Sequence, residues 1–85
     1  MQKPRTHYDN LMVARTASAE VIRAAYKSLT QKYHPDKNPG DPQAARIMAM
    51  INQAYEVLSD PQRRRSHDDW IAQQEQAFQQ AQFEQ

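Results

Sequence analysis

The sequence predicts a small all-α fold of four helices, in which two long amphipathic helices form a central antiparallel hairpin. Three observations support this class. Apolar residues recur at helical spacing along most of the 85-residue chain. Glycine occurs once, although a sheet protein needs many turn residues. Two Asp-Pro pairs, at residues 41–42 and 60–61, match an N-cap followed by proline at the first helical position.

The first two helices are predicted from residue spacing and one cap. Residues 8–13 fit a short helix in which Tyr8, Leu11 and Met12 lie on one side. Ser18 is expected to cap a second helix over residues 19–33. The buried side of that helix is a stripe formed by Ile22, Ala25, Leu29 and Tyr33.

A loop and two further helices follow. Residues 34–41, HPDKNPGD, contain two prolines and the only glycine, so they form the loop. Pro35 disfavours helical geometry at the residue before it, so the second helix should end near Tyr33. A third helix begins at Pro42 and a fourth follows Asp60. Because the loop is short, the two long helices form a hairpin with the loop exposed at its tip.

Size and composition favour a binding module over an enzyme. A chain this short encloses little core, so a deep catalytic cleft is not expected. There is no Cys, which excludes disulfides and thiolate metal sites, and no small-molecule substrate or cofactor is expected. No window approaches the roughly 20 apolar residues that span a membrane, and the first residues lack the apolar stretch of a secretion signal. The expectation is therefore a soluble, cytoplasmic protein.

A basic stripe is predicted on the exposed side of the second helix. Its members are Arg23, Lys27 and Thr30, bordered by Tyr26 and Gln31. A Lys/Arg stripe taken alone is more often a solvated helix face than a binding site. This one leads to residues 34–36, where proline fixes the backbone and an imidazole and a carboxylate are displayed. The combination favours a docking surface.

Three segments closely resemble the J domain of the DnaJ co-chaperone family, in order and in spacing. They are YDNL, VIRAAYKSLTQKYHPDKN and INQAYEVLSDPQRR, and the resemblance covers residues 7–69. The HPD tripeptide carries little weight alone. Its position between KY and KNPGD, followed by AYEVLSDP, makes the resemblance specific.

The resemblance implies a four-helix J-domain-like fold and a non-enzymatic function. J domains bind the ATP-loaded form of a DnaK-type heat-shock chaperone and stimulate its ATP hydrolysis. The tripeptide maps onto His34, Pro35 and Asp36, and the chaperone-contacting face onto Arg23, Tyr26, Lys27 and Gln31, with Lys37 and Lys32 as weaker members. Asp36 would then accept charge-assisted hydrogen bonds from a chaperone arginine. No catalytic residue, metal or cofactor is implied.

The sequence also contains features of two other functions. The run Arg63-Arg64-Arg65 suggests nucleic-acid binding, but such a run more often lies on a solvated helix, and no recognition helix is evident. The three histidines suggest a metal or hydrolytic site, but they lie far apart in sequence and no nucleophile accompanies His34 and Asp36. Neither nucleic acid nor metal is therefore expected.

Residues 70–85 form a Gln-rich tail whose structure the sequence leaves open. Residues 1–65 carry 11 basic and 6 acidic side chains, whereas residues 66–85 carry four acidic ones and no Lys or Arg. The tail is either an extension of the fourth helix or disordered. An acidic tail folded back over the basic second helix is an alternative, and a simple extension or linker is the preferred interpretation.

Overall fold

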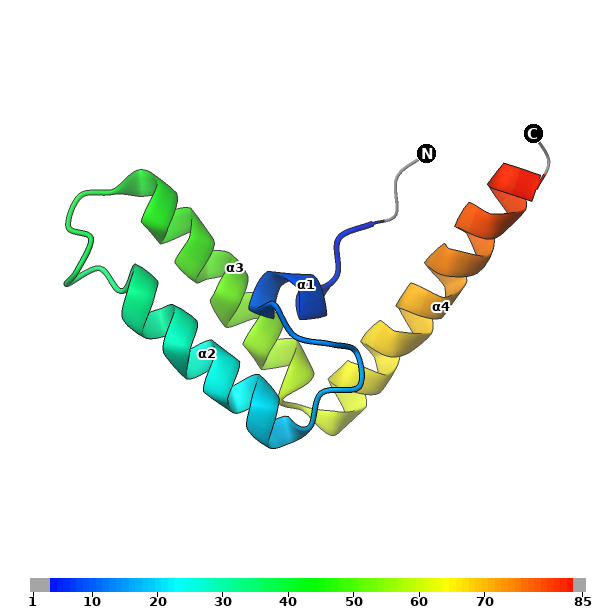
Figure 1. Ribbon diagram of the computed structural model, residues 1–85, viewed down its shortest axis with the longest axis horizontal. Helices are drawn as coiled ribbons and strands as arrows, with labels where there is room; N and C mark the ends of the chain where they lie inside the picture. Colours follow the sequence, from blue (N-terminus) through cyan, green and yellow to red (C-terminus); the bar gives the residue numbers. More distant parts are fainter. Residues whose placement is uncertain (1–3, 84–85) are drawn as a thin grey trace.

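The computed structural model describes residues 4–83, and all regular secondary structure in that range is α-helical (Figure 1). The helices are α1 (His7–Leu11), α2 (Ala19–Tyr33), α3 (Pro42–Leu58) and α4 (Pro61–Phe83). The predicted all-α class with four helices is confirmed, and α2 has the predicted bounds. No helix among the described residues is long and apolar enough to cross a membrane.

Side-chain caps fix where each helix begins. Thr6 and Asp9 form a capping box at the start of α1, which the sequence analysis did not identify. Ser18 accepts a hydrogen bond from the Val21 N–H at 3.2 Å, as its predicted cap role requires. Asp41 caps α3 and Asp60 caps α4, each accepting from the backbone N–H two residues later at 2.9 Å.

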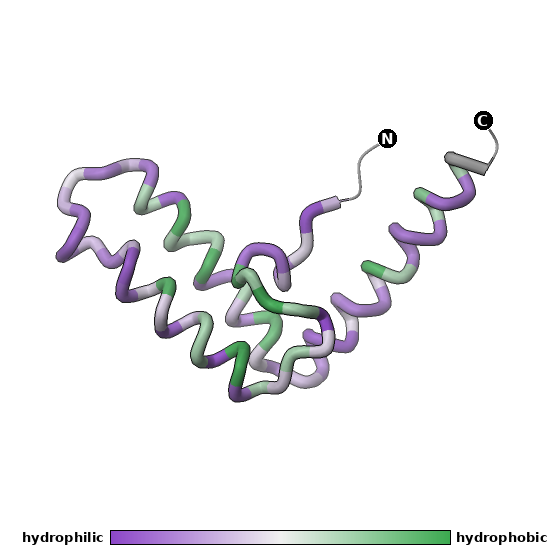
Figure 2. Tube along the Cα trace, in the orientation of Figure 1, coloured by the Kyte–Doolittle hydropathy of each residue, from purple (hydrophilic) through white to green (hydrophobic). Residues whose placement is uncertain are grey.

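α2 and α3 lie antiparallel, and α1 packs across α3 to close a small core (Figure 1). Apolar residues recur along both hairpin helices, while the loop between them and most of α4 are hydrophilic (Figure 2). The buried core consists of Tyr8, Leu11, Ile22, Ile51, Ala54, Leu58 and Ile71. Apolar burial of this kind is the main force that holds a domain of this size together.

Met12 departs from its predicted position. It was expected to lie on one side of the first helix with Tyr8 and Leu11, but α1 ends at Leu11 and Met12 is 80% exposed. Met12 adopts the left-handed conformation, with φ 58° and ψ 42°, and its N–H donates to the Asp9 carbonyl at 3.0 Å. A non-glycine residue in this region costs on the order of 1 kcal/mol. This left-handed residue ends α1 and leads into the α1–α2 loop.

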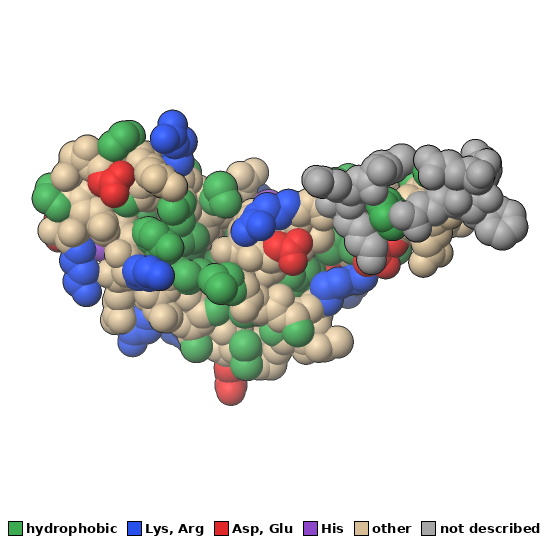
Figure 3. Space-filling model, turned by 45° about the horizontal axis from the view of Figure 1, so that its top comes forward, with side chains coloured by type: hydrophobic (Ala, Val, Ile, Leu, Met, Phe, Trp, Pro, Cys, Tyr) green, Lys and Arg blue, Asp and Glu red, His purple; other side chains and the backbone are tan. Residues whose placement is uncertain are grey.

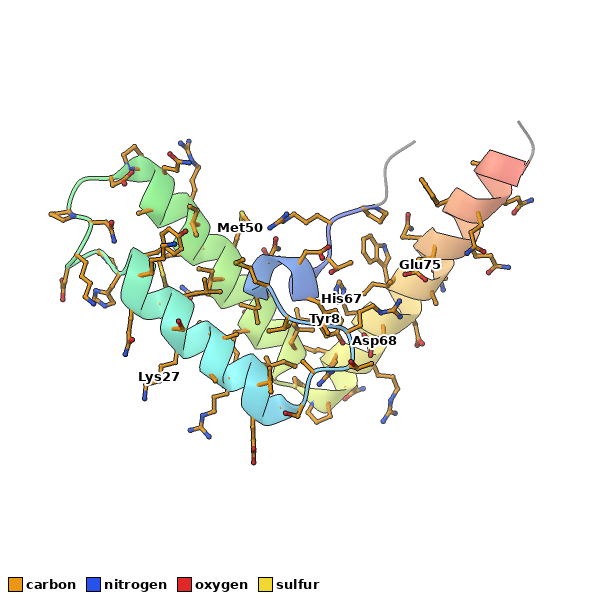
Figure 4. The ribbon with its side chains drawn as sticks, in the orientation of Figure 1. Tyr8, Lys27, Met50, His67, Asp68 and Glu75 are labelled. Carbon is orange, nitrogen blue, oxygen red and sulfur yellow. The ribbon has the colours of Figure 1, made fainter. Side chains whose placement is uncertain are left out.

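A polar cluster joins α1, the α1–α2 loop and α4, and we call it the Arg64 clasp. The Arg64 guanidinium donates to the Tyr8 hydroxyl at 2.9 Å and to the Ala17 and Arg15 carbonyls at 2.7 and 3.1 Å. The Tyr8 hydroxyl donates in turn to the Asp68 carboxylate (Figure 4). Burial, followed by the hydrogen bond to Asp68, raises the pKa of Tyr8, while Arg64 opposes this shift.

The expectation that all three side chains of the Arg63–Arg65 run lie on a solvated helix face is wrong for Arg64. Arg63 pairs with Glu56 at 2.8 Å on the surface, and Arg65 is exposed. Arg64, in contrast, points inward to Tyr8 and the two carbonyls of the α1–α2 loop. Arg64 therefore links α4 to α1 and to the α1–α2 loop.

α4 continues without a break into the Gln-rich tail. Ile71 is buried, at 2% exposure, and the Arg15 guanidinium bonds the Glu75 carboxylate at 2.8 Å. Beyond these contacts α4 projects away from the end of the hairpin that carries residues 34–41 (Figure 1). Glu84 and Gln85, which complete the predicted tail, lie outside the described residues. The part of the tail that the structure describes does not cover α2.

His7 and His67 form a half-buried pair between α1 and α4. The backbone N–H of His7 donates to Nε2 of His67 at 3.1 Å, the two ring centroids are 4.4 Å apart, and His67 also stacks on Trp70. Burial lowers the pKa of both imidazoles, and for His67 the neighbouring His7 and Arg15 lower it further while Asp68 opposes them. Both imidazoles therefore favour the neutral form more strongly than an unperturbed histidine does.

The fold should lose stability as pH falls below the ordinary histidine pKa of 6.5. Because the folded-state pKa values are lowered, the unfolded chain takes up protons first, and stability is greatest above pH 6.5. We expect the free energy of unfolding, from urea denaturation, to decrease between about pH 7.5 and about pH 5.5. His67→Gln, whose amide oxygen can still accept the His7 bond, should show a shallower decrease. An unchanged slope would contradict this origin.

Candidate functional site

Residues 34–41 join α2 to α3 in a turn that is held by its own hydrogen bonds. His34 is extended, with φ −60° and ψ 142°, which ends α2 in front of Pro35 as predicted. The backbone N–H groups of Lys37 and Asn38 both donate to the His34 carbonyl at 3.0 Å. The Asn38 amide donates to the carbonyls of Lys32 and His34, each at 3.0 Å, so it pairs one of the carbonyls in the last turn of α2 and that of its C-cap.

The His34 imidazole and the Asp36 carboxylate are brought together by this turn. The Asp36 N–H donates to Nδ1 of His34 at 3.1 Å, so the neutral ring carries its proton on Nε2. The Asp36 Oδ2 lies 3.6 Å from the same nitrogen, yet the Asp36 side chain is 91% exposed. The arrangement displays a carboxylate whose oxygens can accept hydrogen bonds from a cationic partner.

The predicted basic stripe surrounds a shallow hollow between α2 and α3. This basic hollow, of about 300 Å³, is lined by Arg23, Tyr26, Lys27, Thr30, Gln31 and Tyr55. Lys27 extends from α2 away from the body of the molecule (Figure 4). The structure thus brings Arg23, Tyr26, Lys27 and Gln31 to one place. Lys37 is exposed on the loop and Lys32 lies over the Tyr33 ring at 5.4 Å, so neither lines this hollow.

One residue of α3, Tyr55, completes the basic hollow and was not among the predicted site residues. The Tyr26 and Tyr55 rings stack at 4.1 Å with an 8° interplanar angle, and the Tyr26 hydroxyl donates to the Asn52 side chain at 2.8 Å. This stack gives the hollow an aromatic floor. Tyr55 is also partly buried against the core. Its position beside Tyr26 depends on how α2 and α3 pack, which residue spacing within one helix does not show.

Positive charge does not form a nucleic-acid-binding patch on the face seen in Figure 3. Lys and Arg side chains are spread along that face, with apolar and acidic side chains between them. A nucleic-acid interface instead clusters its basic residues along one patch or helix. Among the described residues, no group of three His, Cys, Asp or Glu side chains is placed to hold a metal ion.

Comparison with known proteins places these features in one family. The DnaJ domain family matches residues 6–68, a segment that includes α1, α2, α3, the loop and the first part of α4. The chain belongs to the DnaJ domain family. The chaperone protein DnaJ of Chlamydia abortus is 55% identical to this DnaJ domain over 62 residues, which is 73% of the chain and 16% of the relative. The corresponding protein of Carboxydothermus hydrogenoformans is 53% identical over 64 residues.

The fold of this DnaJ domain is also similar to solved structures. The crystal structure of the J-Trx1 fragment of ERdj5 superposes with a TM-score of 0.75 at 44% identity, covering 80% of this chain and 34% of that one. The form II crystal structure of ERdj5 gives 0.73 at 43% identity. The DnaJ domain spans less than a fifth of the curated relatives' length, so the likeness concerns this module and not their remaining domains.

Proposed function

We propose that this DnaJ domain is a co-chaperone module that docks on the ATP-loaded form of a DnaK-type heat-shock chaperone and stimulates its ATP hydrolysis. The observation that carries the proposal is the exposed Asp36 carboxylate at the end of α2, the helix whose outer face carries Arg23 and Lys27. A partner that carries an acidic surface beside a cationic group would complement the basic face of α2 and the Asp36 carboxylate. The domain is proposed to span residues 7–69 and to act in the cytoplasm, without catalytic chemistry of its own.

A binding measurement in both nucleotide states tests this function. The labelled domain is titrated with a DnaK-type chaperone loaded with ATP or with ADP. We expect clear binding in the ATP state and at least about tenfold weaker binding in the ADP state, because the proposed partner surface belongs to one conformation. Equal affinity in both states would contradict the proposal.

Reversing the charge of the basic hollow should slow association. Exposed charges steer encounter, so the double variant Arg23→Glu, Lys27→Glu is expected to lower the association rate constant about tenfold at low salt and to weaken its salt dependence. Stopped-flow mixing at two ionic strengths measures both effects. Lys27→Glu should also act more strongly than Arg65→Glu, an equal charge change at an exposed residue of α4. If the two single variants associate at the same rate, the stripe is only a solvated face.

A further inference from the structure

A second hollow lies behind the HPD loop, between the end of α2 and the first turns of α3. This loop hollow has a volume of about 370 Å³. Its walls are largely apolar and are formed by Tyr33, Pro35, Pro42, Ala44 and Ala45. Asp41 is the one charged residue that lines it, and the nearby Lys32 and Lys37 do not. It is therefore distinct from the basic hollow on α2.

The loop hollow stays open because the loop supports itself and the facing residues are small. Asn38 ties the loop to the end of α2, and the Asp41 N–H donates to the Asn38 carbonyl at 3.2 Å. Gly40, at φ 72°, carries no side chain, and a Cβ there would meet nothing within 4 Å. Protein interiors normally fill apolar gaps of this size. An open one at the surface suits a side chain supplied by a partner.

We propose that the loop hollow receives an apolar side chain of the DnaK-type chaperone, from the segment that also supplies the cationic partner of Asp36. This inference rests on the proposed function and names a further contact of the same partner. Pro35 belongs both to the HPD tripeptide and to the wall of the hollow, so a chaperone that reaches Asp36 also reaches its rim.

Charge supports the same occupant. The loop hollow is edged by Asp41 and includes Pro35, the residue before Asp36, whereas the basic hollow is edged by Arg23 and Lys27. The charge of the matching chaperone surface must change from negative to positive along its length. It is acidic where it faces α2, and apolar with a flanking cation where it faces the loop hollow.

A pair of charge-matched variants on α3 tests the proposal. Ala45 lines the loop hollow, whereas Ala49 lies one helical turn further along; both are exposed. Ala45→Glu places a carboxylate where the apolar side chain would be buried, which is unfavourable unless the charge is paired. We expect it to weaken binding of the intact domain to the ATP-loaded chaperone about tenfold, and Ala49→Glu to weaken it less than about twofold. Thermal melting confirms that both variants fold.

High ionic strength and an uncharged variant show whether the loss of chaperone binding arises within the loop hollow or from long-range charge repulsion. The loss in Ala45→Glu should persist at high ionic strength, because burial of a charge is not screened as surface repulsion is. Ala45→Gln should also bind more weakly than Ala49→Gln. If wild type binds and the paired variants bind equally, or if the loss vanishes at high salt, this inference is overturned and the proposed function stands. If wild type does not bind, both are overturned.

Discussion

Asp36→Asn should abolish stimulation of chaperone ATP hydrolysis while the domain stays folded. The Asp36 side chain is 91% exposed and packs against no part of the core, so its charge is free to pair with a partner. Loss of one member of a charge-assisted interface bond costs about 2–5 kcal/mol, which corresponds to an affinity loss of about 30-fold or more. Single-turnover hydrolysis at a fixed domain concentration measures the effect.

The control for this variant is Asp69→Asn, which removes the same charge from an exposed position on α4. It should stimulate hydrolysis as wild type does. Circular dichroism and thermal melting of both variants should match the wild-type domain. Full stimulation by folded Asp36→Asn would show that the loop is not the docking element.

Arg64→Ala should destabilise the domain by about 2–3 kcal/mol. The substitution removes three hydrogen bonds of the Arg64 clasp and leaves the Ala17 carbonyl and the Tyr8 hydroxyl short of a donor. An unsatisfied, partly buried polar group costs about 1–3 kcal/mol. In a domain of this size that loss lowers the Tm by about 10 °C or more. Thermal melting followed by circular dichroism gives the value.

Arg65→Ala provides the matched comparison, because its side chain is exposed and it has the same sequence context. Its free energy of unfolding should stay within about 0.5 kcal/mol of wild type. Equal melting temperatures for the two variants would show that the clasp does not contribute to stability. A large loss of stability in Arg64→Ala alone would show that this arginine has a structural role that its neighbour Arg65 lacks.

The helices and the loop were accessible to sequence reasoning because their signals are local. Ser18 and Asp41 cap helices through backbone groups only two or three residues away. Pro35 ends α2 by a steric effect on its immediate neighbour. The stripe containing Arg23 and Lys27 follows from helical periodicity alone. Local rules therefore predicted the elements that carry the candidate residues, namely α2 and the loop that follows it.

The features that were missed depend on which helix packs against which. Arg64 meets the carbonyls of Arg15 and Ala17 across more than 45 residues of sequence, and nothing in the arginine run distinguishes its middle member. The Tyr26–Tyr55 stack requires the register of α2 against α3. Met12 was misplaced because the helical pattern continues past Leu11, whereas the chain turns there through a left-handed residue.

The central claim is that this DnaJ domain stimulates ATP hydrolysis by a DnaK-type chaperone. Single-turnover hydrolysis by the pre-formed chaperone–ATP complex, with and without the wild-type domain, tests it most directly. For at least one such chaperone from the same organism, we expect the hydrolysis rate to rise with the concentration of wild-type domain and to reach a plateau. Adding the Asp36→Asn variant or the unfolded domain instead should leave the rate unchanged. A rate that is the same with and without the domain for every such chaperone would contradict it.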